Sequence, residues 1–288
     1  GETARSCHRI ERPQLAIAHD DSISSISILY QTIKLDLYDV RAETGVRFSQ
    51  AISPGGKPMT VSSPILNAPN LKPLASAMPD KPVHRVPLIK ATPENLKGYG
   101  EIIDSADARK VEIVRWPSLG WRQVEPGTGD QGGTTEGLFR FQWHGDVLRA
   151  RNEAVDDDYV LGWTCQPSQA REDKQTTPRD ELLLWRCNYH PDGGQLFFPL
   201  EPGPFVTTLA LPGDDITPES FVAFYSEGGT GLYIHPGVWH EALCPVNDSF
   251  RFFGRQGKVH ARVGADFPKE FGCYLSVSLR AEDARDLI

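Results

Sequence analysis

The sequence predicts an all-β fold, a closed antiparallel β-barrel or jelly roll with a few short helices and an extended N-terminal arm. Short strand signals follow one another at regular spacing in the second half of the chain, and turns such as His144-Gly145-Asp146 separate them. Helical periodicity is almost absent there. We expect strands at 138–143, 159–163, 182–189, 195–200, 205–211, 221–226, 231–235, 250–254 and 274–279.

The N-terminal part of the chain differs from the rest in composition. Residues 54–87 contain eight prolines, and proline fixes φ and removes a backbone donor, so this stretch is predicted to be a linker or a surface strap. We place a boundary near residue 83. It separates an extended, proline-rich arm (1–83) from one barrel domain (84–288). We expect the arm to lack a hydrophobic core, with an alternating strand near 28–37 docked on a barrel edge or a partner chain.

A short helix is expected just after this boundary. Thr92 precedes Pro93 and Glu94, an order typical of an N-cap, a first helical residue and an acidic first turn. Gly98 and Gly100 limit its length.

Composition and charge restrict the class of protein. The chain has 288 residues, 39% hydrophobic and 24% charged, with a formal net charge of −8. This is typical of a soluble globular protein, and it argues against nucleic acid as a partner because basic clusters are missing. No run approaches the roughly 18–20 apolar residues of a membrane span, so we expect no transmembrane segment.

The cysteines indicate a reducing compartment. They are five in number, widely spaced and free of C-x-x-C pairs, so we expect reduced thiols in a cytoplasmic or organelle-matrix protein. The chain begins with Gly1 rather than methionine, from which we expect that a targeting peptide or a tag was removed. The cysteines are Cys7, Cys165, Cys187, Cys244 and Cys273.

The first candidate motif runs from Asn188 to Gly203. His190 and Gln195 lie within it, at the spacing of the second histidine and the glutamate in the first cupin motif, H-x-H, three or four residues, E, six or seven residues, G. Gly203 takes the closing glycine, and Asn188 replaces the first histidine. Because residues two apart on a strand face the same side, Asn188 and His190 can both point into a barrel.

The second candidate motif runs from Gly229 to Cys244 and resembles the second cupin motif, G, five residues, P-x-G, two residues, H, three residues, N. Gly237 and His240 match it, while His235 stands at the proline position and Cys244 at the asparagine position. The two motifs together predict a cupin-type barrel with one shared pocket.

The predicted metal site consists of His190, Gln195 and His240. Imidazole and amide oxygen ligands suit Ni²⁺, Mn²⁺, Fe²⁺ or Zn²⁺ in an open site. The alternative is structural, since a neutral glutamine binds a divalent ion less well than a carboxylate, and a single histidine is commonly a satisfied core residue.

A longer resemblance surrounds both motifs. Residues 190–200 (HPDGGQLFFPL) and 233–243 (YIHPGVWHEAL) are similar to the H-P-x-G-(S/T)-Q-x-F-x-P-L and Y-H-x-x-V-W-H-x-P-L runs of the ureidoglycolate lyase family. The similarity covers about 85–280, and residues 1–83 have no counterpart in compact members. The resemblance implies a lyase of purine catabolism (allantoin degradation) that eliminates urea from ureidoglycolate, or from a similar 2-hydroxy acid, to give glyoxylate.

The resemblance also implies residue roles. A base must take the proton of the C2 hydroxyl and an acid must protonate the departing urea nitrogen. The predicted catalytic residues are His235, His240 and Glu241, and the predicted substrate-binding residues are Asn188, Tyr233 and Arg251. Strand alternation sets His240 and Glu241 on opposite faces, which favours His235 as proton carrier unless a bulge intervenes. His260 lies outside both motifs and is expected to matter far less.

Two other interpretations stay open. A non-catalytic cupin subunit of a larger assembly, anchored by the N-terminal strap, fits the weakened ligand set, and a homodimer is also expected for the enzyme. Other cupin chemistry, such as that of an isomerase or dioxygenase, ordinarily needs a stronger ligand set.

Overall fold

The computed structural model describes residues 37–41, 47–51, 78–118 and 120–286, and their secondary structure confirms the all-β prediction. Helical segments among these residues are short: α1 (Phe267–Glu270), η3 (Pro218–Ser220) and η4 (Ala281–Asp283). In this part of the chain no helix is long and apolar enough to cross a bilayer.

Strands β1 (Leu37–Arg41) and β2 (Arg47–Ala51) pair antiparallel with each other. Apart from Leu37, the strand expected near 28–37 lies outside the described residues, as does most of the expected arm.

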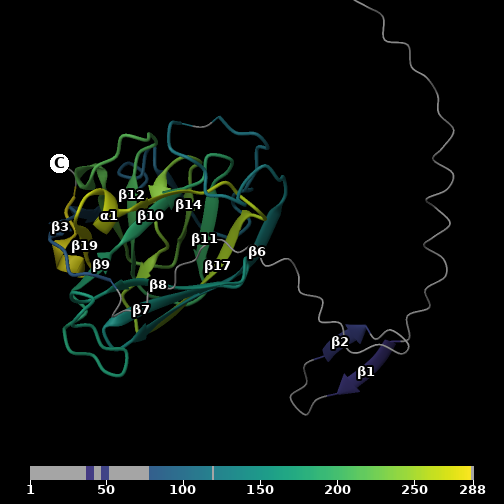
Figure 1. Ribbon diagram of the computed structural model, residues 1–288, viewed down its shortest axis with the longest axis horizontal. Helices are drawn as coiled ribbons and strands as arrows, with labels where there is room; N and C mark the ends of the chain where they lie inside the picture. The colour runs from purple at the N-terminus through teal and green to yellow at the C-terminus, as the bar shows by residue number, and fades with distance from the viewer. Residues whose placement is uncertain (1–36, 42–46, 52–77, 119, 287–288) are drawn as a thin grey trace, which may run out of the picture. The chain divides into compact units, whose positions relative to one another are not determined.

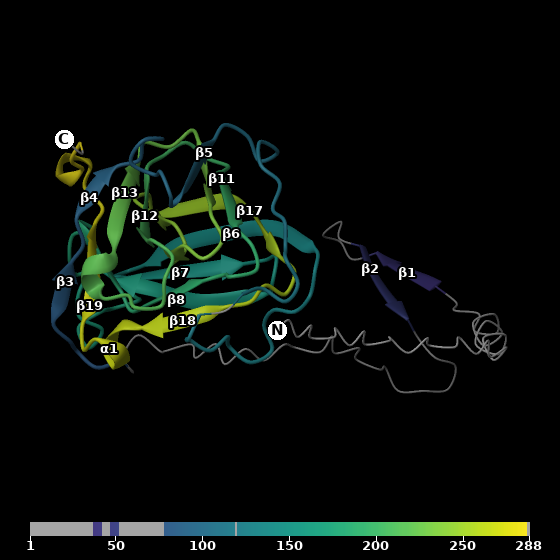
Figure 2. The same cartoon turned by 90° about the horizontal axis from the view of Figure 1, so that it is seen from above.

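The larger of the two main sheets has ten strands. Figure 1 labels β6, β11 and β17 next to one another within it. Its order is β3-β19-β9-β8-β7-β6-β17-β11-β14-β5. Figure 2 shows β6, β7 and β8 side by side. The strands are β3 (Val83–Arg85), β5 (Gly100–Ile103), β6 (Thr134–His144), β7 (Val147–Asn152), β8 (Asp157–Trp163), β9 (Glu181–Leu184), β11 (Gln195–Pro199), β14 (Gly231–Ile234), β17 (Ser249–Gly257) and β19 (Tyr274–Ser278).

The second sheet has seven strands in the order β18-β10-β15-β12-β13-β4, with β16 also paired to β12. The pairing is antiparallel except that β4 runs parallel to β13, as β3 does to β19 in the larger sheet. The strands are β4 (Leu88–Lys90), β10 (Arg186–Tyr189), β12 (Phe205–Ala210), β13 (Val222–Ser226), β15 (Trp239–His240), β16 (Cys244–Pro245) and β18 (Val263–Asp266).

One hydrophobic core joins the two sheets, although hydrogen bonds do not close them into a single ladder. The ring of Phe205 on β12 meets that of Phe252 on β17, with centroids 5.3 Å apart. Strand β17 explains how this core reaches the site, because its residues alternate between the two faces of the sheet. Phe250 and Phe252 are buried at 1% and 0% exposure, and Gln256 follows on the same face.

The helix expected at Thr92 is absent. Residues 93–99 form turns instead, although the Thr92 hydroxyl accepts the Asn95 amide at 3.2 Å, as an N-cap would. The chain turns away because Gly98 adopts a φ of +90°, a left-handed conformation that ends a helix. The capping contact of Thr92 is present, but the turns that follow it end at residue 99 and lead into β5.

A buried carboxylate at the β6–β7 turn organises the loop that follows β8. Asp146 has 0% exposure and accepts hydrogen bonds from the backbone amides of Arg171, Thr176 and Thr177 at 3.0, 2.6 and 3.2 Å. Burial alone would raise the pKa of Asp146, but these bonds and that of the Thr176 hydroxyl outweigh it and lower the pKa. The carboxylate therefore stabilises the loop in its charged form.

We expect Asp146→Ala to lower the free energy of unfolding by about 3 kcal/mol, because three loop amides lose their shared acceptor and a hydrogen bond to a charged group contributes about 1.5–3 kcal/mol. The wild-type contribution is present at neutral pH and is lost as the pH falls through the lowered folded-state pKa. Urea denaturation at several pH values measures both effects. Asp173→Ala is the control, since Asp173 forms an exposed pair with Arg171. Equal losses for the two variants would contradict the assignment.

Candidate functional site

The three residues predicted as metal ligands lie together between the two main sheets. His190 follows β10 and His240 lies on β15 of the seven-stranded sheet, whereas Gln195 begins β11 of the ten-stranded sheet. Their exposures are 6%, 3% and 6%. His240 Nε2 lies 3.2 Å from Gln195 Oε1, and the two imidazole centroids are 5.1 Å apart. The predicted residues therefore share one interior site.

Two glycines make this convergence possible. A Cβ on Gly194 would lie 2.4 Å from the Tyr233 hydroxyl oxygen, so a larger residue would displace the turn that delivers Gln195. Gly237 adopts a φ of +78° and donates its amide to the His190 carbonyl at 2.9 Å. The turn before β15 is thereby attached to the end of β10, which places the two histidines side by side.

Both histidines direct Nδ1 at a backbone carbonyl. The distances are 2.8 Å from His190 Nδ1 to Ala261 O and 2.8 Å from His240 Nδ1 to Val238 O. Burial lowers the pKa of His240 to about 4, and burial together with the neighbouring histidines lowers that of His190 well below its usual value. Each ring is therefore neutral near pH 7. Since a carbonyl can only accept, Nδ1 of His190 carries the proton and its Nε2 keeps a lone pair, whereas His240 has a second acceptor, the Gln195 oxygen, beside its Nε2.

A third histidine belongs to the same cluster, although the sequence motifs missed it. The ring of His260 stacks on that of His190 with centroids 3.6 Å apart and planes 14° from parallel. Its exposure is 9%, its Nδ1 is buried with no hydrogen-bond partner among the described residues, and burial lowers its pKa to about 3. His260 is therefore a site residue and not the neutral control that its position outside the motifs suggested.

A row of buried amides extends from Gln195 across the ten-stranded sheet. Gln195 Nε2 donates to Gln256 Oε1 at 3.0 Å, and Asn152 Nδ2 donates to the same oxygen at 2.9 Å. The Ala154 amide donates to Asn152 Oδ1 at 3.1 Å. Asn152 and Gln256 are 7% and 5% exposed. Neither residue lies in a recognised motif, and the only sequence signal is a polar residue at the end of an alternating strand.

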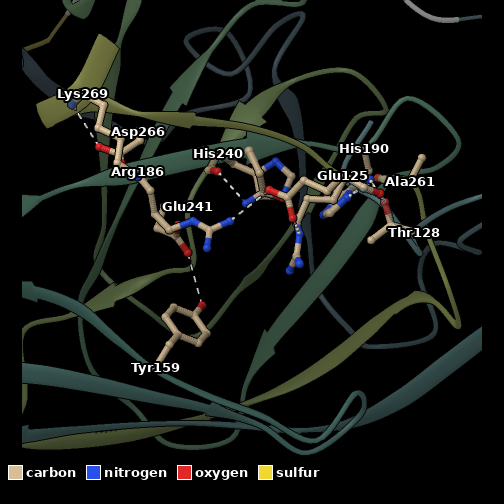
Figure 3. A network of polar contacts seen from close by, with 12 residues as sticks. Glu125, Thr128, Tyr159, Arg186, His190, His240, Glu241, Ala261, Asp266 and Lys269 are labelled. Atoms are coloured by element: carbon tan, nitrogen blue, oxygen red, sulfur yellow. Dashed lines mark hydrogen bonds and ion pairs between the residues drawn. The ribbon is translucent and has the colours of Figure 1, made fainter. Parts of the chain in front are cut away.

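Glu241 lies in a buried polar network beside His240 (Figure 3). Its carboxylate accepts the Tyr159 hydroxyl of β8 at 3.2 Å, and Arg186 Nε lies 4.0 Å away. Burial raises the pKa of Glu241, partly opposed by the Arg186 charge. β15 ends at His240. Because strand alternation ends there too, His240 and Glu241 both reach side chains of the ten-stranded sheet.

Asn188 pairs with His240 across β10 and β15 and donates Nδ2 to the His240 carbonyl at 3.3 Å. Its Oδ1 is buried, and the described residues offer it no hydrogen-bond partner. A buried acceptor therefore lies next to the histidine cluster.

The structure does not bring the other predicted residues to this cluster. His235 Nε2 lies 3.3 Å from Glu101 at the surface, and Tyr233 packs with Arg109 over its ring, 5.2 Å from the centroid. The side chains of Tyr233 and His235 alternate with that of Ile234 and so point to the opposite face of the sheet. Ile234 is the residue that pairs with Gln195 between β14 and β11. Arg251 forms an exposed ion pair with Glu201. The roles predicted for these side chains stay predictions.

Comparison with known proteins gives a partial match. The family model described as ureidoglycolate lyase matches residues 139–264. Proteins named ureidoglycolate lyase are similar over shorter stretches. That of Azotobacter vinelandii is 37% identical over 78 residues, 26% of this chain and 47% of that protein. That of Pseudomonas savastanoi pv. phaseolicola is 38% identical over 79 residues, 27% of this chain and 46% of that protein.

A further ureidoglycolate lyase, from Pseudomonas fluorescens, is 36% identical over 90 residues, 31% of this chain and 52% of that protein. The chain thus spans about half the length of the curated relatives it matches. The family match encloses the histidine cluster, the amide row and Glu241.

The stacked histidines offer a matched stability test. His190→Leu leaves the Ala261 carbonyl without its donor and should cost about 1–3 kcal/mol of unfolding free energy. His260→Leu removes a buried nitrogen for which the described residues provide no partner, so it should cost less or stabilise. Urea denaturation of both variants gives the comparison. If His260→Leu lowers the free energy of unfolding as much as His190→Leu does, the Nδ1 atom of His260 contributes a stabilising interaction.

Proposed function

We propose, on the premise that residues 139–264 belong to the ureidoglycolate lyase family, that the chain eliminates urea from ureidoglycolate to give glyoxylate. The observation that carries the proposal is the buried contact between His240 and Gln195, which lies within the matched region and draws on both sheets. Such a contact gives a small hydroxy acid convergent polar groups inside an otherwise apolar interior.

The elimination requires two proton transfers, from the C2 hydroxyl and to the urea nitrogen. Of the two predicted proton carriers besides His240, Glu241 is the better candidate because it is buried and hydrogen-bonded to Tyr159, whereas His235 faces Glu101. Tyr159 shares a face of β8 with Asp157, which pairs with Asn152 of the amide row. In this proposal Glu241 and Gln195 therefore belong to the same buried site between the two sheets.

Asn188 is proposed to bind the substrate. Its buried Oδ1 lacks a partner among the described residues, and the ureido group of the substrate carries N–H donors that could satisfy it. Arg251, the substrate-binding candidate paired with Glu201 at the surface, is less suited to this role.

A divalent cation is proposed at the histidine cluster. The fit depends on the ligand atoms present: His240 Nε2, when unprotonated, and the Gln195 oxygen are 3.2 Å apart, a spacing that suits two adjacent ligands. His190 would add a second imidazole. When bound, the cation would polarise the substrate hydroxyl and orient the carboxylate. The set depends on the glutamine, because the described residues hold no group of three His, Cys, Asp or Glu arranged for a metal.

The cellular setting is proposed to be purine catabolism through allantoin, in the cytoplasm or an organelle matrix. The support is chemical: the four described cysteines, Cys165, Cys187, Cys244 and Cys273, are free thiols, as expected in a reducing compartment.

We expect His240→Ala to reduce ureidoglycolate turnover by at least about 10²–10⁴-fold, the range for loss of an acid–base group. Glyoxylate release measures turnover, and circular dichroism shows whether the variant is folded. Arg251→Ala is the control and should keep nearly full activity, because Arg251 lies in an exposed ion pair with Glu201.

Two results would count against this proposal in different ways. Wild-type protein that releases no glyoxylate with any added divalent metal would remove the lyase function and favour a non-catalytic subunit of an assembly. Activity that survives in His240→Ala would keep the function but move the site.

A further inference from the structure

The amide row that ends at Gln195 is anchored at both ends by backbone groups. At one end the Ala154 amide donates to Asn152 Oδ1 at 3.1 Å. At the other end His240 Nδ1 meets the Val238 carbonyl at 2.8 Å. A backbone amide can only donate and a backbone carbonyl can only accept. The direction of the three hydrogen bonds from Ala154 to Gln195 is therefore determined by chemistry and not by the choice of amide orientation.

The direction is followed from the Ala154 end. Because Asn152 accepts through Oδ1, its Nδ2 faces Gln256 and donates to Oε1 at 2.9 Å. Gln256 therefore presents an oxygen, and the neighbouring Gln195 must present Nε2 to it, at 3.0 Å. The Gln195 oxygen is then left pointing at His240. Turning the Gln195 amide would set two oxygens against each other.

At the other end, His240 has an acceptor beside each ring nitrogen, the Val238 carbonyl 2.8 Å from Nδ1 and the Gln195 oxygen 3.2 Å from Nε2. When the ring proton is on Nδ1, Nε2 and the Gln195 oxygen both offer electron pairs to the same buried site. A divalent cation can take both atoms as adjacent ligands, whereas it cannot take an amide nitrogen in place of the oxygen.

We propose that Asn152 and Gln256 are positioning residues that hold the Gln195 amide oxygen toward His240 and so reserve the site for a divalent cation. The inference rests on the cation of the proposed function but not on the lyase reaction. Asn152 and Gln256 touch neither the cation nor the substrate in this assignment. They act by deciding which end of the Gln195 amide enters the site.

Asn152→Asp is a test in which amide orientation and simple electrostatics predict opposite changes in cation affinity. Aspartate at this position can still accept the Ala154 amide but can no longer donate to Gln256. Gln256 must then turn its amide nitrogen toward the new carboxylate at position 152. Gln195 has to turn its oxygen toward Gln256 in response, and it therefore presents Nε2 to His240. Asn152→Asp should therefore weaken cation binding by at least about 10-fold, the usual range for outer-shell changes. Simple electrostatics predicts the opposite, because a nearby negative charge attracts a cation.

Gln256→Glu is the matched control. It adds the same charge to the same row with nearly the same shape, but glutamate still accepts from both Asn152 and Gln195. The Gln195 oxygen keeps its direction, so cation affinity should be unchanged or higher. Gln256→Met removes the acceptor without adding charge. It frees the Gln195 amide to turn, and affinity should again fall at least about 10-fold.

The experiment is isothermal titration of the full chain with Mn²⁺ and, separately, Ni²⁺, with thermal melts to confirm that each variant is folded. The proposal is supported if Asn152→Asp and Gln256→Met bind the ions more weakly than Gln256→Glu does. It is overturned if both charged variants bind more tightly, or if neither differs from the wild type. Should Asn152→Asp fail to fold, the two Gln256 variants decide by the same comparison.

Wild-type protein that binds neither ion would also overturn the proposal. That result is distinct from failure of the lyase function, which is decided by glyoxylate release and not by the titration.

Discussion

The structure depends on one constraint: a polar side chain buried between two apolar sheets must find its partner inside the protein. Strand β17 shows the constraint directly. Its inward face begins with Phe250 and Phe252, which pack in the shared core, and ends with Gln256, which accepts two hydrogen bonds. An unpaired amide at such a depth would cost about 1–3 kcal/mol. The hydrogen-bonded row from Asn152 to His240 is therefore as much a condition of folding as a candidate for function.

The residues of the candidate site and three of the outer strands come from different parts of the chain. The family match covers residues 139–264 and contains every side chain assigned to the site. Strands β3, β4 and β5 lie before this region, and they pair with β19, β13 and β14. The similarity to known lyases thus concerns the interior and its polar groups, whereas these bordering strands are contributed by residues 83–103.

The sequence was sufficient for His190, Gln195 and His240 and for most of the strands, because apolar runs and motif spacing are local signals. It missed β3, β4, β5, β7 and β18 and joined β9 and β10 into one strand, although they belong to different sheets. It was insufficient for Asn152, Gln256 and His260. Their importance arises from the register between β7, β17 and β11 and from a stacking contact, neither of which leaves a local pattern. The expected helix at Thr92 failed for a related reason. Its capping chemistry was present, but a left-handed glycine a few residues later ended the segment.

The position of residues 83–103 has a consequence for solubility. Each main sheet has two outer strands, β3 and β5 in one and β18 and β4 in the other. Three of these four borders are therefore supplied by a single short stretch of chain. Open borders present unpaired amides and carbonyls that recruit other chains into aggregates. If this stretch detached, three interior strands, β19, β13 and β14, would be exposed together, so its attachment is also a safeguard against self-association.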